Sequence, residues 1–312
     1  MNTNVAKIVN EVEKVISGKR EVVEKILTAI LAGGHVLLDD IPGIGKTTMA
    51  VAISRSLGLK FGRIQFTPDV TASDIVGFSM YNKGRDAFEY KPGIAVGVNL
   101  LLGDEINRTS SKTQSALLEA MEEGQVTVDG GTHPLENPFI VIATQNNVGT
   151  AGTQMLPYAQ LDRFLVKLSI GYPDLKSEIA VIQGRQGANP LENVEQILGV
   201  DDVVKMQNEV ADVTVSEPIV SYIARLSEAS RAHELLELGI SPRGSLFVNK
   251  MAKARAYAAG RDFVIGEDVQ GVFVDTCAHR VLLSPAALAG KITATAALLA
   301  LLNEVKVPDG KK

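Results

Sequence analysis

The sequence predicts an α/β fold in which helices cover a parallel sheet, followed by a second domain made of helices. In the first half of the chain, short apolar runs alternate with longer segments of helical periodicity, the pattern of strands joined through helices. Beyond residue 200, Ala, Leu, Val, Glu and Lys recur at helical spacing, and strand signals fade. The 312 residues are enough for two domains, each with its own core.

Five runs are predicted to form the strands of one parallel sheet. They are apolar enough to be covered on both faces, as the strands of a parallel sheet are. They span residues 35–39, 62–66, 99–103, 139–144 and 165–170. Between them, "GKTTMAVAISRSLG" and "SSKTQSALLEAMEEG" have helical periodicity, and each ends in a glycine suited to a left-handed cap. The sheet should therefore end near Ile170.

The domain junction is predicted just after the last strand. Turn residues begin this stretch and a polar Gly/Asn/Pro cluster ends it. We therefore expect a first domain over residues 1–172, a linker over 173–200 and a helical domain over 201–312.

Composition and charge exclude several classes of protein. The net charge of -5 leaves no basic excess, which counts against a nucleic-acid binder. Cys277 is the single cysteine, so the chain alone builds no disulfide or cysteine cluster, and His35, His133, His233 and His279 show no ligand spacing. The N-terminus lacks the apolar run of a signal peptide, and the apolar stretch 292–302 is shorter than the ~20 residues of a membrane span. We expect a cytoplasmic protein without a membrane span.

The stretch "LDDIPGIGKTT" at residues 38–48 predicts a phosphate-binding loop between a strand and a helix. Backbone N–H groups at such a helix start bind phosphate, a lysine adds charge and a hydroxyl holds Mg²⁺. Asp40 stands where the pattern G-x-x-x-x-G-K-[ST] has its first glycine, but it lies at the strand exit, away from the phosphates. The strand-loop-helix context disfavours an unrelated surface turn. The predicted nucleotide-binding residues are Pro42, Gly43, Ile44, Gly45, Lys46, Thr47 and Thr48.

Two adjacent carboxylates end the third predicted strand, in "NLLLGDEINR". Asp104 would hold Mg²⁺ together with Thr47, and Glu105 would orient or polarise the water that attacks the γ-phosphate. Taken alone, the pair could equally be a solvated acidic turn. Together with the phosphate loop, it predicts a site for ATP and Mg²⁺.

Several ordered blocks closely resemble the MoxR family of AAA+ ATPases. They are "IQFTPDVTASDIVG", "DEINRTSSKTQSALLEAMEEGQVTVDG", "VIATQN" and "QLDRF", and the resemblance covers roughly residues 15–260. It implies an AAA+ P-loop αβα core with a parallel five-stranded sheet, followed by a helical lid domain. Asp is common at the first phosphate-loop position in that family, so Asp40 fits the resemblance.

The resemblance also assigns roles near the γ-phosphate. Asn146 would be the sensor-1 residue that helps position the attacking water, with Thr144 as the second candidate; the family pattern continues with proline where Asn147 stands. Arg163 looks like the arginine finger, which reaches a nucleotide held by the adjacent subunit and stabilises charge there. The alternative for Arg163 is an ion pair with Asp162 or another acid of its own chain.

Three further polar residues have weaker assignments. Arg243, in "GISPRGSLF", resembles sensor 2, whose arginine contacts the γ-phosphate from the lid; the alternative is an exposed arginine at a helix start, where the dipole slightly disfavours it. Arg108 could lie at a subunit interface or be solvated. Gln65 could couple substrate engagement to Glu105.

Two segments are expected to project from the core. Residues 68–93 fall where the helix-2 insertion of this AAA+ clade lies, and "GQVTVDGGTHPL" alternates like a hairpin around Asp129-Gly130. Within the insertion, Tyr81, Phe88 and Tyr90 could contact a substrate or could pack the insertion onto its own sheet.

The function that follows from the resemblance is Mg²⁺-dependent ATP hydrolysis that drives chaperone-like remodelling or maturation of a client protein. It implies a homo-oligomeric ring, expected to be a hexamer, and a separate partner with a von Willebrand factor A domain. The alternatives are a nucleic-acid motor of the helix-2-insertion clade, which the acidic balance disfavours, a P-loop small-molecule kinase, which needs no arginine from a neighbour, and a non-hydrolysing nucleotide switch.

Overall fold

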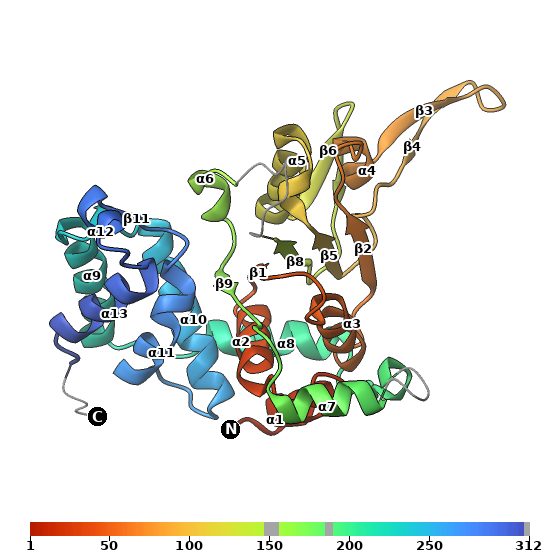
Figure 1. The fold of residues 1–312 in the computed structure, drawn as a ribbon. Helices are drawn as coiled ribbons and strands as arrows, with labels where there is room; N and C mark the ends of the chain where they lie inside the picture. The colour runs from red at the N-terminus through yellow and green to blue at the C-terminus, as the bar shows by residue number, and fades with distance from the viewer. Residues whose placement is uncertain (147–155, 185–189, 309–312) are drawn as a thin grey trace.

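The computed structural model describes residues 1–146, 156–184 and 190–308 and shows two lobes side by side (Figure 1). One lobe contains a five-stranded sheet in which every neighbouring pair is parallel. The strands lie in the order β2 (Phe61–Gln65), β5 (Leu100–Asp104), β8 (Ile140–Gln145), β1 (Val36–Asp39) and β9 (Val166–Leu168). The predicted parallel sheet is confirmed, with strand ends within two residues of the predicted ones.

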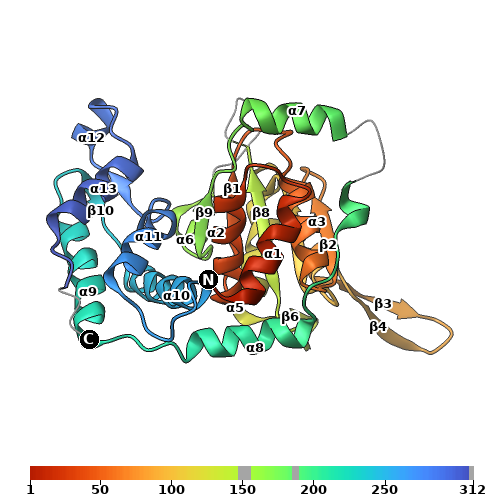
Figure 2. The same cartoon turned by 90° about the horizontal axis from the view of Figure 1, so that it is seen from below.

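Helices cover both faces of this sheet. Because side chains alternate along a strand, Val36 and Leu38 of β1 pack on one face and Leu37 on the other. The first face carries α1 (Thr3–Glu13), α2 (Arg20–Leu31) and α3 (Lys46–Ser56), and the second carries α5 (Ser111–Glu123), as Figures 1 and 2 show. The αβα core is therefore confirmed.

The segment between the two lobes contains secondary structure of its own. It includes α7 (Leu175–Gly184) and a 3-10 turn at Pro190–Asn193. The next helix, α8 (Val200–Ala211), packs beneath the sheet lobe, where the Gln207 side chain donates a hydrogen bond of 2.8 Å to the carbonyl of Ile30 in α2. The domain boundaries near residues 172 and 201 remain a prediction.

The second lobe is helical, as expected. It consists of α9 (Glu217–Ala232), α10 (Pro242–Ala258), α11 (Gly266–Cys277), α12 (Pro285–Ala289) and α13 (Ala294–Glu304), with a two-stranded ribbon of β10 (Leu236–Leu238) and β11 (Leu282–Leu283). Contacts of α10 with α2 join its core to that of the sheet lobe. Across the described part of the chain, no helix combines the length and apolar character that crossing a membrane requires.

Two hairpins project from the sheet lobe. In the predicted insertion, α4 (Ala72–Val76) precedes the long hairpin of β3 (Phe78–Asn82) and β4 (Ala87–Lys91), which extends away from the core (Figure 1). The second hairpin joins β6 (Gln125–Val128) to β7 (Gly131–Pro134) through Asp129 and Gly130, whose φ values of 49° and 80° suit a tight two-residue turn. The predicted hairpin is confirmed.

The three aromatic residues of the insertion with predicted roles, Tyr81, Phe88 and Tyr90, differ in their surroundings. The Tyr90 ring stacks on His133 of the second hairpin at 3.6 Å between centroids, and its hydroxyl donates a 2.5 Å hydrogen bond to the Val76 carbonyl. Tyr81 and Phe88 contact each other edge to face, and Phe88 is 74% exposed. Tyr90 thus anchors the insertion, whereas Tyr81 and Phe88 are available at its surface.

Candidate active site

The phosphate loop follows β1 and leads into α3. Gly43 and Gly45 have φ values of 86° and 91°, in the left-handed region that glycine adopts without strain. A Cβ built on Gly43 would meet no atom within 4 Å, so the inner side of the loop is open to a ligand. α3 begins at Lys46 directly after the loop, which directs its unpaired N–H groups and the positive end of its dipole toward that space. The loop therefore fits a phosphate chain.

Lys46 is held in place at the mouth of this loop. Its Nζ donates hydrogen bonds to the backbone carbonyl of Asp40, at 2.8 Å, and to Oδ1 of Asn146, at 2.7 Å. Burial lowers the pKa of the Lys46 ammonium, while the nearby carboxylates of Asp40 and Asp104 act in the opposite direction. The predicted lysine and the predicted sensor residue are thus in direct contact.

Asp104, the last residue of β5, lies beside the start of α3. Thr47 Oγ1 is 3.5 Å from Asp104 Oδ2, and Thr144 Oγ1 donates to Asp104 Oδ1 at 3.3 Å. A hydroxyl and a carboxylate are the hard oxygen ligands that Mg²⁺ prefers. The described residues contain no cluster of three or more His, Cys, Asp or Glu around one point, so a Mg²⁺ ion here would complete its shell with phosphate and water oxygens. The residues present fit the ion.

Glu105 is fixed by three neighbours in a strained backbone conformation. Its φ of 58° lies in the left-handed region, which is uncommon for non-glycine residues and costs free energy that the surrounding contacts must offset. Its N–H donates to Thr144 Oγ1 at 2.9 Å, while Asn146 Nδ2 and Arg108 Nη1 donate to its two carboxylate oxygens at 2.7 and 2.8 Å. Asn146 therefore links Lys46 to Glu105. Thr144 forms hydrogen bonds with both Asp104 and Glu105.

Asp40 fastens the phosphate loop to the end of the neighbouring strand β9. Its Oδ2 accepts hydrogen bonds from Ser169 Oγ and from the Gly171 N–H, each at 3.0 Å, and from the Ile170 N–H. A glycine at this position would leave those backbone donors without the carboxylate. The departure from the G-x-x-x-x-G-K-[ST] pattern thus serves a structural purpose.

The two predicted arginines converge on one acid, Glu122 of α5. Arg163 lies between α6 (Tyr158–Leu161) and β9, and its Nε is 2.8 Å from Glu122 Oε2. Arg243 lies in the first turn of α10, and its Nη2 is 2.5 Å from Glu122 Oε1. The hydrogen bond from Arg163, together with the charges of both arginines, lowers the pKa of the Glu122 carboxyl. The intrachain ion pair weighed for Arg163 is thus present, with Glu122 as the acid.

Both arginines lie at the edge of the sheet opposite to the phosphate loop. The N–H of Leu165 bonds to the carbonyl of His35, at the start of β1, whereas the phosphate loop follows the end of β1. A strand length of roughly 15 Å separates the two edges. A cavity of about 280 Å³ at this edge is lined by both arginines, Glu122, His35 and Lys250. In this arrangement Arg243 lies away from the phosphate loop of its own subunit.

Three features of the site were not predicted from the sequence: the contacts of Arg63, the acid Glu122 and the structural role of Asp40. Arg63 of β2 donates from Nε to Asp104 Oδ2 at 2.8 Å, next to Thr47, and its Nη2 lies 3.5 Å from Gln65 Oε1. Side chains two apart on a strand share a face, so Arg63 could have been recognised from Gln65, which was predicted near the nucleotide. Glu122 and the structural role of Asp40 had no such signal, because their partners are distant in the sequence.

Three further residues named from the sequence are Asn147, Cys277 and His35. Asn147 lies outside the described residues. Cys277 is buried, and burial raises the pKa of its thiol to about 12. The ring of His35 connects three elements, because Nδ1 accepts from the Val141 N–H and Nε2 lies 3.1 Å from the carbonyl of Met121.

Comparisons with known proteins agree with this geometry. The family model of the ATPase family associated with various cellular activities (AAA) matches residues 35–166, and that of an AAA lid domain matches residues 228–300. The chain is 47% identical to the uncharacterized protein YeaC of Bacillus subtilis (strain 168), over 97% of this chain and 94% of that protein. It is 40% identical to Chaperone MoxR1 of Mycobacterium tuberculosis (strain ATCC 25618 / H37Rv), over 96% of this chain and 81% of the relative.

A solved structure shares the whole architecture. The crystal structure of a candidate ATPase from Cytophaga hutchinsonii ATCC 33406 superimposes with a TM-score of 0.90 at 38% identity, covering 98% of this chain and 95% of that one. Fold, site and relatives together define a nucleotide-binding AAA+ ATPase with a helical lid. More specifically, the chain belongs to the MoxR family of AAA+ ATPases.

Proposed function

We propose that this ATPase uses Mg²⁺-dependent hydrolysis of ATP to remodel or mature a client protein, as a ring in which each active site is completed by the next subunit. One observation carries the proposal: the residues suited to bind and cleave the triphosphate lie at one edge of the sheet, and the two arginines suited to stabilise the transition state lie at the other.

At the phosphate-binding edge, each residue has a separate task. The backbone of residues 42–48 and the ammonium of Lys46 bind the phosphates, while Thr47 and Asp104 hold the metal. Mg²⁺, when bound, neutralises charge on the phosphate oxygens. Glu105 polarises the attacking water and accepts its proton, with Asn146 keeping the carboxylate oriented toward Lys46.

At the opposite edge, Arg163 and Arg243 serve a neighbouring copy. Their side chains are 31% and 41% exposed, so another subunit can approach them. Placing the phosphate loop of one copy against the arginines of the next is a head-to-tail contact between two different surfaces, and such a contact closes into a ring when its rotation allows. The family resemblance puts the expected number of subunits at six.

The proposal also includes a contact surface for the client and a separate partner protein. The exposed aromatic pair Tyr81 and Phe88, on a hairpin that projects from the core, offers an apolar contact for a client. The resemblance further implies a separate partner with a von Willebrand factor A domain. The relative named a chaperone supports the remodelling activity.

Release of inorganic phosphate measured over a range of protein concentrations tests the enzymatic part. We expect the specific activity to rise with concentration as subunits assemble, and to vanish when EDTA removes Mg²⁺. A strictly monomeric preparation with full activity would contradict the shared active site. Phosphate release that requires an added small-molecule acceptor would point to a kinase instead.

Capture of a client tests the remodelling part. The Glu105→Gln variant should bind ATP without cleaving it and so retain a client that wild-type protein releases. Lys46→Ala, which lacks the phosphate-binding cation, is the matched control and should retain none. A variant of the exposed tip, Phe88→Ser combined with Glu105→Gln, should retain less client if the hairpin contacts it.

A further inference from the structure

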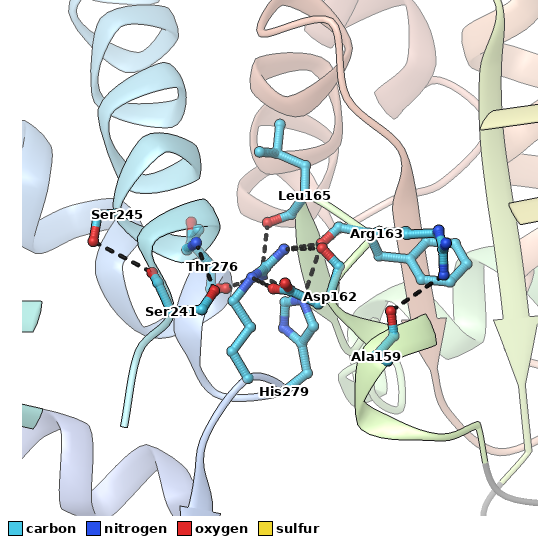
Figure 3. A network of polar contacts seen from close by, with 11 residues as sticks. Ala159, Asp162, Arg163, Leu165, Ser241, Ser245, Thr276 and His279 are labelled. Atoms are coloured by element: carbon cyan, nitrogen blue, oxygen red, sulfur yellow. Dashed lines mark hydrogen bonds and ion pairs between the residues drawn. The ribbon is translucent and has the colours of Figure 1, made fainter. Parts of the chain in front are cut away.

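Arg280, in the turn between α11 and β11 of the lid, is buried against the core. Its side chain is 1% exposed, and its Nε forms an ion pair of 2.8 Å with Asp162 Oδ1. Figure 3 shows the polar contacts around Asp162, Leu165 and His279. The same guanidinium donates to the backbone carbonyls of Asp162, at 3.2 Å, of Leu165, at 3.4 Å, and of Phe164. Arg280 therefore contacts the residues on both sides of Arg163.

The guanidinium of Arg280 also contacts the helix that carries Arg243. It lies 4.8 Å from the centroid of the Phe247 ring in α10. A Cβ on Gly244, the residue directly after Arg243, would lie 2.7 Å from Ile240 Cγ2 and 3.2 Å from Arg280 Cδ, so the glycine lets both side chains pack against this turn of α10. The buried Arg280 side chain thus contacts both the segment that contains Arg163 and the helix that contains Arg243.

His279 strengthens the same attachment. Its Nε2 lies 3.0 Å from the carbonyl of Phe164, and burial beside the Arg280 charge lowers the pKa of the imidazole well below its usual value. Without Arg280, the carbonyls of residues 162, 164 and 165 would lose a charged donor in a buried place, and the segment would be free to shift. His279 and Arg280 thus attach the backbone on both sides of Arg163 to the lid.

We propose that Arg280 is a positioning residue that holds Arg163 and Arg243 at a fixed spacing and thereby couples the lid of one subunit to ATP hydrolysis in its neighbour. The inference rests on the proposed trans role of Arg163. A displacement of about 1 Å can lower a rate about 10²-fold, so loosening this segment affects the chemical step. In the homogeneous assembly, Arg280→Ala should lower kcat about 10- to 100-fold and leave the KM for ATP nearly unchanged, because the nucleotide is bound by the other subunit.

Mixed assemblies of two inactive variants test the proposal. Arg163→Ala subunits keep an intact phosphate-binding edge but lack the finger, and Glu105→Gln subunits keep the finger but cannot cleave ATP. Mixing them should restore phosphate release where a Glu105→Gln subunit presents its arginines to an Arg163→Ala subunit. Adding Arg280→Ala to the Glu105→Gln subunit should lower this restored activity about 10- to 100-fold. The same change in the Arg163→Ala subunit should leave it unaltered, since the arginine edge of that subunit completes no active site: a Glu105→Gln neighbour cannot cleave ATP, and an Arg163→Ala neighbour receives no finger from it.

The outcomes separate the two proposals. If mixing restores nothing, the trans role of Arg163 is overturned, and the coupling by Arg280 with it. If mixing restores activity but Arg280→Ala lowers it equally in either subunit, the change acts through folding and the coupling alone is overturned.

Two further variants guard against misfolding. Asp162→Asn removes the ion pair and keeps the shape, and it should reproduce the same asymmetry at a smaller size. Arg261→Ala removes a lid arginine whose pair with Asp268, at 2.7 Å, lies within the lid. It should show no asymmetry, and an asymmetry equal to that of Arg280→Ala would count against a specific role for Arg280.

Discussion

The two edges of the central sheet are built in contrasting ways. At the phosphate-binding edge, Lys46, Asn146 and Glu105 form one chain of two hydrogen bonds, each of 2.7 Å. Glu105 and Asn146 directly follow β5 and β8, and Lys46 begins α3 after the phosphate loop. At the other edge, Arg163 and Arg243 come from different lobes and share a single acid. The two arginines at the first edge, Arg63 and Arg108, are each paired with an acid of the site, whereas the two arginines at the second edge share one acid. The contrast is the basis of the proposal that a complete site requires two copies of the chain.

The largest expected effect comes from removing Arg163 at the second edge. Replacing it with alanine should lower kcat about 10³-fold, because an arginine finger stabilises charge in the transition state, while ATP binding at the opposite edge should persist. Phosphate release and nucleotide binding, measured side by side, check both statements. Arg163→Lys should recover little, since lysine keeps the charge without the planar fork. Equal turnover by wild type and Arg163→Ala would refute the role of the second edge.

Glu105→Gln tests the first edge in the same way. Loss of the carboxylate that polarises water should lower kcat about 10²-fold with little change in ATP affinity. Glu119, an exposed acid on α5, offers a matched control, and Glu119→Gln should hydrolyse ATP at the wild-type rate. Unchanged turnover in Glu105→Gln would mean that another group activates the water.

Asp40→Gly would complete the usual phosphate-loop pattern, yet it should destabilise the protein. The change removes the acceptor for the N–H groups of Ile170 and Gly171, with an expected loss of about 2 kcal/mol in the free energy of unfolding. Urea denaturation measures this loss. Asp40→Asn retains an acceptor oxygen and should lose less. A gain in stability for the glycine variant would show that the carboxylate is unimportant to this edge.

Glu122→Gln tests whether the shared acid holds the two arginines in place. The neutral amide no longer offsets two guanidinium groups, so Arg163 and Arg243 should separate, and kcat should fall about tenfold. Glu123→Gln, at the neighbouring position, is the control. If Glu122→Gln raises kcat instead, Glu122 restrains the arginines from reaching the neighbouring nucleotide.

The smallest expected effect is a pH dependence of stability at the arginine edge. Burial lowers the pKa of His35 to about 4, from an ordinary value of 6.5. Below pH 6.5 the unfolded chain therefore takes up a proton that the folded chain refuses, so stability is fully present above that pH and is lost as pH falls toward 4. Between pH 7 and 5.5 the loss should be on the order of 1 kcal/mol.

Unfolding by urea at both pH values measures the loss. His35→Asn should flatten the dependence in this window, leaving the contribution of His279, whose pKa is lowered in the same direction. An unchanged slope in His35→Asn would show that the pKa of His35 in the folded chain is not lowered.

Much of the fold and of the first edge could be predicted from the sequence, because these features depend on local patterns. Apolar runs of strand length with helices between them predict a parallel sheet. In such a sheet all carboxyl ends lie at one edge, so residues that follow different strands must meet there. Lys46, Asp104 and Glu105 could be grouped for this reason, whereas Asn146 and Thr144 are assigned from the resemblance to the MoxR family.

Only the tertiary structure decided how the second edge is arranged. The positions of Arg163 and Arg243 depend on how the lid docks onto α2 and β9, and no periodicity in the sequence encodes that docking. Glu122 pairs with Arg163 and Arg243, which are 41 and 121 residues away in the sequence, and Arg280 pairs with Asp162, which is 118 residues away. In space, each of these pairs is separated by 2.8 Å or less. Strand order and helix faces follow from local chemistry, whereas contacts between two lobes follow from the packing of complete surfaces.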